Sequence, residues 1–192
     1  MKSIIFVLFL VLASGQLIAQ TNQQEKGQAE QCASLRRGEH LPKLADFAVP
    51  KSATIHPKPP ILSTAKDRHY RTAIRTSTVK GENFAGHYTI AQWGCGTGCL
   101  EFVIVDVSTG KVYDPFFQTV DYHYPSEDLD TESEWWCYTE NLNYSLDSRL
   151  LIIEGCLSGK SCGRNYFVME PSGLRHIHYD PDLLKDGTKA PF

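Results

Sequence analysis

Four of the six cysteines occupy equivalent places in two similar stretches of sequence, and this recurrence limits the possible folds most. Gly94-Cys95 precedes Cys99 in the first stretch, and Gly155-Cys156 precedes Cys162 in the second. Each cysteine pair is followed by an apolar segment, FVIVD or YFVME, and then by a glycine-containing turn. Both stretches therefore predict the same unit: a strand, a cysteine-flanked turn, a strand, a glycine turn and a further strand.

Two such meanders are too few for a propeller, which needs at least about four blades. We expect them to form one antiparallel sheet or a small sandwich. A helix is predicted from about Ser63 to about Thr78, because Ser63 or Thr64 can cap it and Gly81 is a suitable stop. The expected fold is α+β: mainly antiparallel β-structure built from two meander repeats, with one N-terminal helix packed on the sheet and disulfides as staples.

The predicted helix has two different faces. Apolar or aromatic side chains recur at helical spacing on one of them, namely Ala65, His69, Tyr70, Ala73 and Ile74. The cations lie mostly outside that face, namely Lys66, Arg68, Arg71 and Arg75. A basic helix face can bind an acidic ligand, or it can be an ordinary solvated surface. The sequence leaves both interpretations open.

The beginning of the chain predicts export. Residues 1–19 contain Lys2, an apolar run and then small residues, which is the order of a secretory signal peptide with a cut after Ala19. The apolar run is short for a membrane span, and an uncleaved anchor is the alternative. Residues 20–31 are polar and predict a flexible leader, which leaves 32–192 as a single globular domain. We expect a periplasmic or extracellular protein that does not span the membrane.

In an exported protein an even number of cysteines predicts disulfides, because an oxidising compartment favours them. The recurrence favours Cys95–Cys99 and Cys156–Cys162, which leaves Cys32 to pair with Cys137. The alternative joins the two units by linking Cys95 to Cys156. A redox centre is disfavoured because the Cys-x-x-x-Cys spacing lies between predicted strands rather than at a helix start. A zinc site is disfavoured because an exported protein is expected to have its cysteines in disulfides. A phosphate-binding loop is disfavoured because no helix is predicted after the turn.

Catalysis has little support in the sequence. The motifs of the common hydrolase and metalloprotease classes do not occur, so we expect no catalytic residue, no cofactor and no metal. His87 follows a glycine at the start of a predicted strand, where it can act as a general base or hydrogen-bond to a loop carbonyl. His176 and His178 alternate along a strand, so both would face one side and, with Asp180, would suit a metal.

The favoured hypothesis is an exported, non-enzymatic protein of the binding or inhibitor type, whose partner is another envelope or extracellular protein. Its contact surface would be the two stapled turns, Gly94–Cys99 and Cys156–Arg164. The candidate contact residues are Trp93, Thr97, Ser158, Lys160, Arg164 and His87. A net charge of −3 argues against nucleic-acid binding. The alternative is a small hydrolase or metal-dependent enzyme that uses His87 or the pair His176 and His178.

Several short motifs lie between Ser63 and Tyr179: NFAGHY, WGCG, TGK and DSRL. They correspond to Asn83–Tyr88, Trp93–Gly96, Thr109–Lys111 and Asp147–Leu150, together with Cys99 and Asp106. In these motifs the chain resembles a family of small exported bacterial proteins of unassigned function. The resemblance implies export and a bacterial source, and it implies no particular activity.

Overall fold

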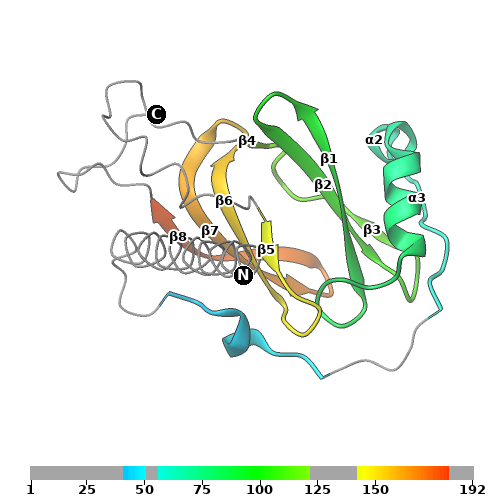
Figure 1. Cartoon of the computed structure of the whole chain (residues 1–192), viewed down its shortest axis with the longest axis horizontal. Coiled ribbons are helices and arrows are strands. Elements are labelled where there is room, and N and C mark those ends of the chain that lie inside the picture. The colour runs from blue at the N-terminus through cyan, green and yellow to red at the C-terminus, as the bar shows by residue number, and fades with distance from the viewer. Residues whose placement is uncertain (1–40, 51–55, 122–141, 182–192) are drawn as a thin grey trace, which may run out of the picture. The chain divides into compact units, whose positions relative to one another are not determined.

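The computed structural model describes residues 41–50, 56–121 and 142–181 (Figure 1). The predicted signal peptide, the predicted leader and the predicted Cys32–Cys137 disulfide lie outside the described residues. Among the described residues, no helix has the length and apolar character needed to cross a membrane.

The described strands form one antiparallel sheet of eight, in the order β1-β2-β4-β6-β7-β8, with β3 paired to β2 and β5 paired to β6. The first group of strands is β1 (Tyr88–Gly96), β2 (Cys99–Asp106) and β3 (Val112–Tyr113). The second group is β5 (Leu142–Tyr144), β6 (Leu150–Leu157), β7 (Lys160–Glu170) and β8 (Gly173–Pro181). Between the groups lies the two-residue strand β4 (Val120–Asp121). The prediction of a mainly antiparallel fold with a small helical part is confirmed.

The main core lies between the two groups of strands. Because successive side chains of a strand point to opposite faces, alternate residues of both groups meet on one side. The buried members from the strands include Ile90, Phe102, Ile104, Leu151, Ile153, Phe167 and Met169. Burial of these aromatic and branched side chains is the principal contribution to stability.

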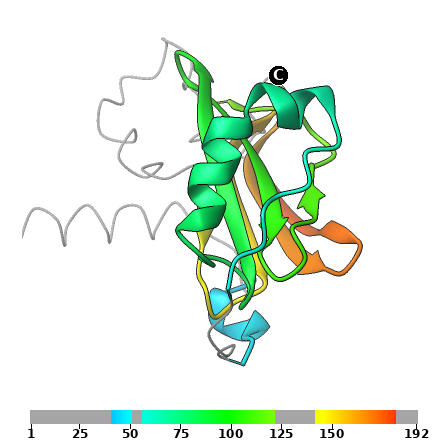
Figure 2. The same cartoon turned by 90° about the vertical axis from the view of Figure 1, so that its right-hand side faces the viewer.

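Two short helices cover the other face of β1 and β2 (Figure 2). They are α2 (Ala65–His69) and α3 (Arg71–Val79), so the helical segment predicted from the sequence is divided at Tyr70. Thr64 begins the segment with a capping box, in which its hydroxyl accepts from the Asp67 N–H at 3.0 Å. Ile74 is fully buried against the strands and anchors the helices to the sheet.

The segments before the helices lie along the sheet. The 3-10 helix η1 (Leu44–Phe47) packs its apolar residues on the outer face of β6 and β7. The proline-containing segment after residue 55 hydrogen-bonds across the turn that follows β2: the Ile61 N–H donates to the Gly110 carbonyl at 2.8 Å. Gly110 has a φ of +81°, and a β-carbon there would overlap the Pro59 carbonyl oxygen. This turn therefore requires glycine.

Candidate functional site: the two stapled turns

Both predicted local disulfides, Cys95–Cys99 and Cys156–Cys162, are present, and each closes the end of a hairpin. The first cysteine of each pair lies at an irregularity of the ladder, between Gly94 and Gly96 in one hairpin and between Gly155 and Leu157 in the other. Such a bulge bends its strand. Each disulfide therefore holds a bent hairpin end in one shape.

Strand β4 brings the two stapled turns together. Asp121 pairs with Cys99 on one side and with Cys156 on the other. Figure 1 shows the β1–β2 and β6–β7 turns at the same end of the sheet, next to β4. Gly155 permits this approach, because a β-carbon there would lie 2.5 Å from the Asp121 carbonyl oxygen. The two turns consequently share one edge of the protein.

The second stapled turn is fastened to the residues before β4. The Ser158 N–H donates to the Thr119 carbonyl at 2.9 Å, and the Ser158 hydroxyl accepts from the Gln118 N–H at 2.9 Å. The Asp121 carboxylate accepts from the Gly159 N–H at 2.8 Å and from the Thr119 hydroxyl at 2.9 Å. Ser158 was expected to contact a partner, but its hydroxyl serves this internal network. Sequence reasoning missed Asp121 and Thr119, because neither belongs to a recurrent motif.

Thr97 and Lys160 are the candidate contact residues that remain available at this edge. Both are exposed, one in each stapled turn. Within 41–50, 56–121 and 142–181, neither side chain has a hydrogen-bond or ion-pair partner. A ligand that bridges the two turns would meet these side chains without displacing an internal contact.

Trp93 lies under the helices rather than at the turns. Its ring stacks on Tyr70 with centroids 4.2 Å apart and an interplanar angle of 21°. The Lys66 ammonium lies 5.7 Å from its ring centroid, and its indole nitrogen is buried. The geometry thus assigns Trp93 a packing role between helix and sheet, and not the exposed anchor that was expected.

Arg164 is also engaged inside the protein. Its guanidinium Nε donates to the Glu154 carboxylate at 2.7 Å, and both side chains are only 13 % exposed. Burial alone would lower the pKa of Arg164, but the charge of Glu154 and a hydrogen bond with Tyr166 outweigh burial and raise it. This cross-strand pair joins β6 to β7. The charge of Arg164 is thus paired within the protein, and not free to contact a partner as was expected.

His87 lies beside Asp106, at the far ends of β1 and β2 from the disulfides. Its ring is half-buried and lies 4.1 Å, between centroids, from that of Tyr88. Burial would raise the pKa of Asp106, but hydrogen bonds from Ser108 and Thr109, with the nearby His87, lower it overall.

This arrangement is not that of a catalytic triad. The Ser108 hydroxyl donates to Asp106 at 2.6 Å instead of contacting the imidazole. Over the described part of the chain, no hydroxyl hydrogen-bonds to the His87 ring. The nucleophile–base contact that serine hydrolases need is therefore not formed by these residues.

His176 and His178 do not face the same side, and that expectation is wrong. The ladder between β7 and β8 shifts register between Tyr166 and Phe167. His176 lies opposite Phe167 with ring centroids 4.9 Å apart, whereas His178 lies opposite Tyr166 at 5.4 Å. Phe167 belongs to the main core and Tyr166 to the cluster on the opposite face. An extra residue in β8 thus breaks the alternation that a shared metal site requires.

One motif that carries the family resemblance, NFAGHY, contacts the residues that lead into another, DSRL. The N–H groups of Ala85 and Gly86 donate to the carbonyls of Ser145 and Leu146, at 3.2 and 2.6 Å. Asn83 accepts from the Ile90 N–H at 2.8 Å and so holds the same turn against β1. NFAGHY and the segment leading into DSRL therefore have a structural role where they join the two groups of strands.

Taken together, the fold and these contacts define a small disulfide-stabilised antiparallel β-protein with two stapled turns at one edge. Comparison with protein-family models, with curated proteins and with solved structures finds no match to this chain.

Proposed function

We propose that this chain is an exported, non-enzymatic protein that binds another envelope or extracellular protein through its two stapled turns. The observation that carries the proposal is the position of Asp121 between Cys99 and Cys156. It makes a single surface from two turns that lie far apart in the sequence. Export is supported by the order of residues at the N-terminus and by the disulfides, which oxidising compartments favour.

The physical basis of binding is preorganisation. A flexible loop loses conformational entropy when it binds, at about 0.5–1.5 kcal/mol for each side chain that becomes immobilised. Each turn here is closed by a disulfide, and the second is also hydrogen-bonded to residues 118–121. The main chain of both turns is therefore ordered on folding and loses little further entropy when a partner binds. Thr97 and Lys160 would supply the contacts to the partner, and the ordering cost that remains is that of their own side chains.

We also infer that the two groups of strands are copies of one meander unit. The bulged cysteine, the disulfide across the turn and the pairing of the second strand with a third occur in both groups. The copies differ in their turns. Both Ser158 and Gly159 have positive φ, whereas in the first turn Gly98 has positive φ and Thr97 does not. We further propose, on the sequence motifs alone, that the chain belongs to the family of small exported bacterial proteins.

The proposal is tested by site-specific photo-cross-linking in exporting cells. A photoreactive amino acid replaces Thr97 in one variant and Lys160 in another, and Thr76 on the exposed side of α3 serves as the matched control. We expect both turn positions to capture the same protein, at a yield well above that of the control. Equal capture from all three positions would place the contact elsewhere and overturn the proposal.

The affinity for the captured partner gives a second measurement. Thr97→Arg and Lys160→Glu should each weaken binding about tenfold or more, since they place bulk or opposite charge in the contact. Thr76→Arg and Lys58→Glu are the matched controls and should bind as the wild type does. Ser158 is avoided because its replacement would break internal hydrogen bonds. Unchanged affinity in both turn variants would show that the turns are scaffold only.

A further inference from the structure

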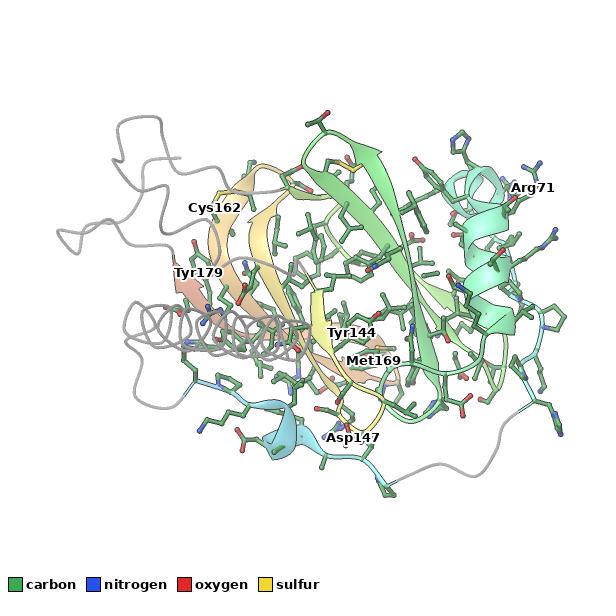
Figure 3. The ribbon with its side chains drawn as sticks, in the orientation of Figure 1. Arg71, Tyr144, Asp147, Cys162, Met169 and Tyr179 are labelled. Carbon is green, nitrogen blue, oxygen red and sulfur yellow. A yellow bond between two sulfur atoms is a disulfide. The ribbon has the colours of Figure 1, made fainter. Side chains whose placement is uncertain are left out.

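The outward side of α2 and α3 carries a row of arginines that the stapled turns do not involve. Arg68, Arg71 and Arg75 are all exposed, and Figure 3 shows Arg71 on the side of the helix that faces away from the sheet. Arg71 and Arg75 are four positions apart in α3 and share one face of that helix. Arg68 belongs to α2, and the Arg71 guanidinium reaches its carbonyl oxygen. We call these three residues the arginine row.

The arginine row has no acidic partner among the residues that the structure describes. Arg68 donates to the Ser63 carbonyl at 2.8 Å, and Arg71 donates to the Arg68 carbonyl at 3.1 Å, so both guanidinium groups hydrogen-bond to the main chain of their own segment. Lys66, in contrast, lies 3.4 Å from the Glu101 carboxylate on the sheet. The row is thus an uncompensated positive face on a chain whose net charge is −3.

An exposed aliphatic side chain extends this face. Val79, the last residue of α3, lies one turn after Arg75 and is 80 % exposed, whereas Ile74 on the other side of the helix is fully buried. A single exposed valine has no special meaning. Helices that lie on membrane surfaces combine Lys and Arg side chains with apolar residues that enter the boundary between headgroups and acyl chains. Val79 is the apolar residue that this face offers.

We propose that this face, the arginine row with Val79, binds the surface of an anionic phospholipid bilayer. The planar guanidinium groups match phosphate oxygens in a bidentate manner, and Val79 would enter the boundary between headgroups and acyl chains. Each basic residue near an anionic membrane raises partitioning about fivefold, so the three arginines together contribute about 100-fold. The association is peripheral and reversible, and it leaves the stapled turns free for a protein partner.

Vesicle co-sedimentation tests the proposal with the exported protein as it is recovered from cells. The vesicles contain equal parts of phosphatidylglycerol and phosphatidylcholine, and vesicles of phosphatidylcholine alone are the reference. Replacing all three arginines of the row by glutamine should lower binding to the anionic vesicles about 100-fold. The matched control replaces Lys43, Lys58 and Lys111 by glutamine, which removes the same charge from exposed positions outside both proposed surfaces and should leave most of the binding.

Thermal melting verifies that every variant is folded, as expected for substitutions of exposed side chains. Val79→Ser distinguishes binding to a bilayer surface from binding to soluble phosphate. It should weaken vesicle binding several-fold and leave pyrophosphate binding unchanged. An equal loss in the arginine and lysine variants would show a general charge effect and overturn the proposal. The proposal is also overturned if the wild-type protein does not bind the anionic vesicles. It is likewise overturned if the wild-type protein binds soluble heparin more tightly than the vesicles and Val79→Ser leaves vesicle binding unchanged.

Discussion

Cys99 and Cys156 belong to different disulfides, yet both pair with Asp121, from opposite sides of β4. In the described sheet, β4 is the strand between β2 and β6. The two-residue strand therefore connects the two groups of strands at the edge where the stapled turns lie. Substitutions that disturb β4 should affect both the stability of the protein and its binding surface.

Asp121→Ala should lower the free energy of unfolding by about 1–3 kcal/mol, because the Gly159 N–H and the Thr119 hydroxyl lose their acceptor. Asp147→Ala is the matched control, since this exposed carboxylate accepts from the Ser145 hydroxyl in its own turn. Urea unfolding measures both. Equal losses for the two variants would contradict the role assigned to Asp121.

Gly110→Ala should be far more destabilising than Gly81→Ala. Both glycines have positive φ, +81° and +93°, so both substitutions strain the backbone by about 1–2 kcal/mol. A new β-carbon at Gly110 would also overlap the Pro59 carbonyl, whereas at Gly81 it would meet nothing within 4 Å. Thermal unfolding of the two variants isolates this overlap. Similar melting temperatures would mean that the segment containing Pro59 does not lie against the turn.

Ile74→Ala should cost about 2–5 kcal/mol, because Ile74 is fully buried between α3 and the sheet. Val79→Ala on the same helix should change stability by less than about 0.5 kcal/mol, since Val79 is 80 % exposed. Denaturant titrations followed by circular dichroism compare them. A larger effect at Val79 would mean that the opposite helix face is the buried one.

Stability should fall at alkaline pH because of Tyr88. Burial, followed by the nearby Tyr113 and Asp106, raises the pKa of Tyr88 from 10.0 to about 12. The folded chain keeps the phenol proton at pH values at which the unfolded chain loses it, so the free energy of unfolding decreases as pH rises from about 10 toward about 12. At about 1.4 kcal/mol per pKa unit, the decrease approaches about 3 kcal/mol.

Urea unfolding at a series of pH values above 9 measures this dependence. Tyr88→Phe should flatten the alkaline slope relative to the wild type, because the variant has no phenol to titrate at this position. Identical slopes for the two proteins would show that Tyr88 does not control the alkaline behaviour.

Local features of the sequence predicted a large part of the fold. The runs of β-branched and aromatic residues identified the long strands. The cap at Ser63 or Thr64 and the helical spacing after it predicted one helix from about Ser63 to about Thr78, where the structure has α2 and α3. The disulfides Cys95–Cys99 and Cys156–Cys162 were predictable because their cysteines are only 4 and 6 residues apart. Residues close together in the sequence determine contacts of this kind, so the periodicity and spacing of the sequence predict them.

The candidate site was predictable only in part. Thr97 and Lys160 were identified from the turns alone, and both are exposed there. Ser158 was identified on the same grounds, but its hydroxyl accepts from the Gln118 N–H, 40 residues away in the sequence. The position of Asp121 carries no local signal, since a two-residue strand is too short to show alternation.

The sequence by itself determined which segments become the long strands, where the helical segment begins and which turns are stapled, because short-range sterics and hydrogen bonding control those choices. The tertiary structure alone decided that Trp93 lies beneath Tyr70 and that His176 and His178 lie on opposite faces. It also decided that both stapled turns meet at Asp121. These outcomes depend on strand register, on bulges and on packing between distant segments, and a one-residue shift in register moves a side chain to the other face of the sheet.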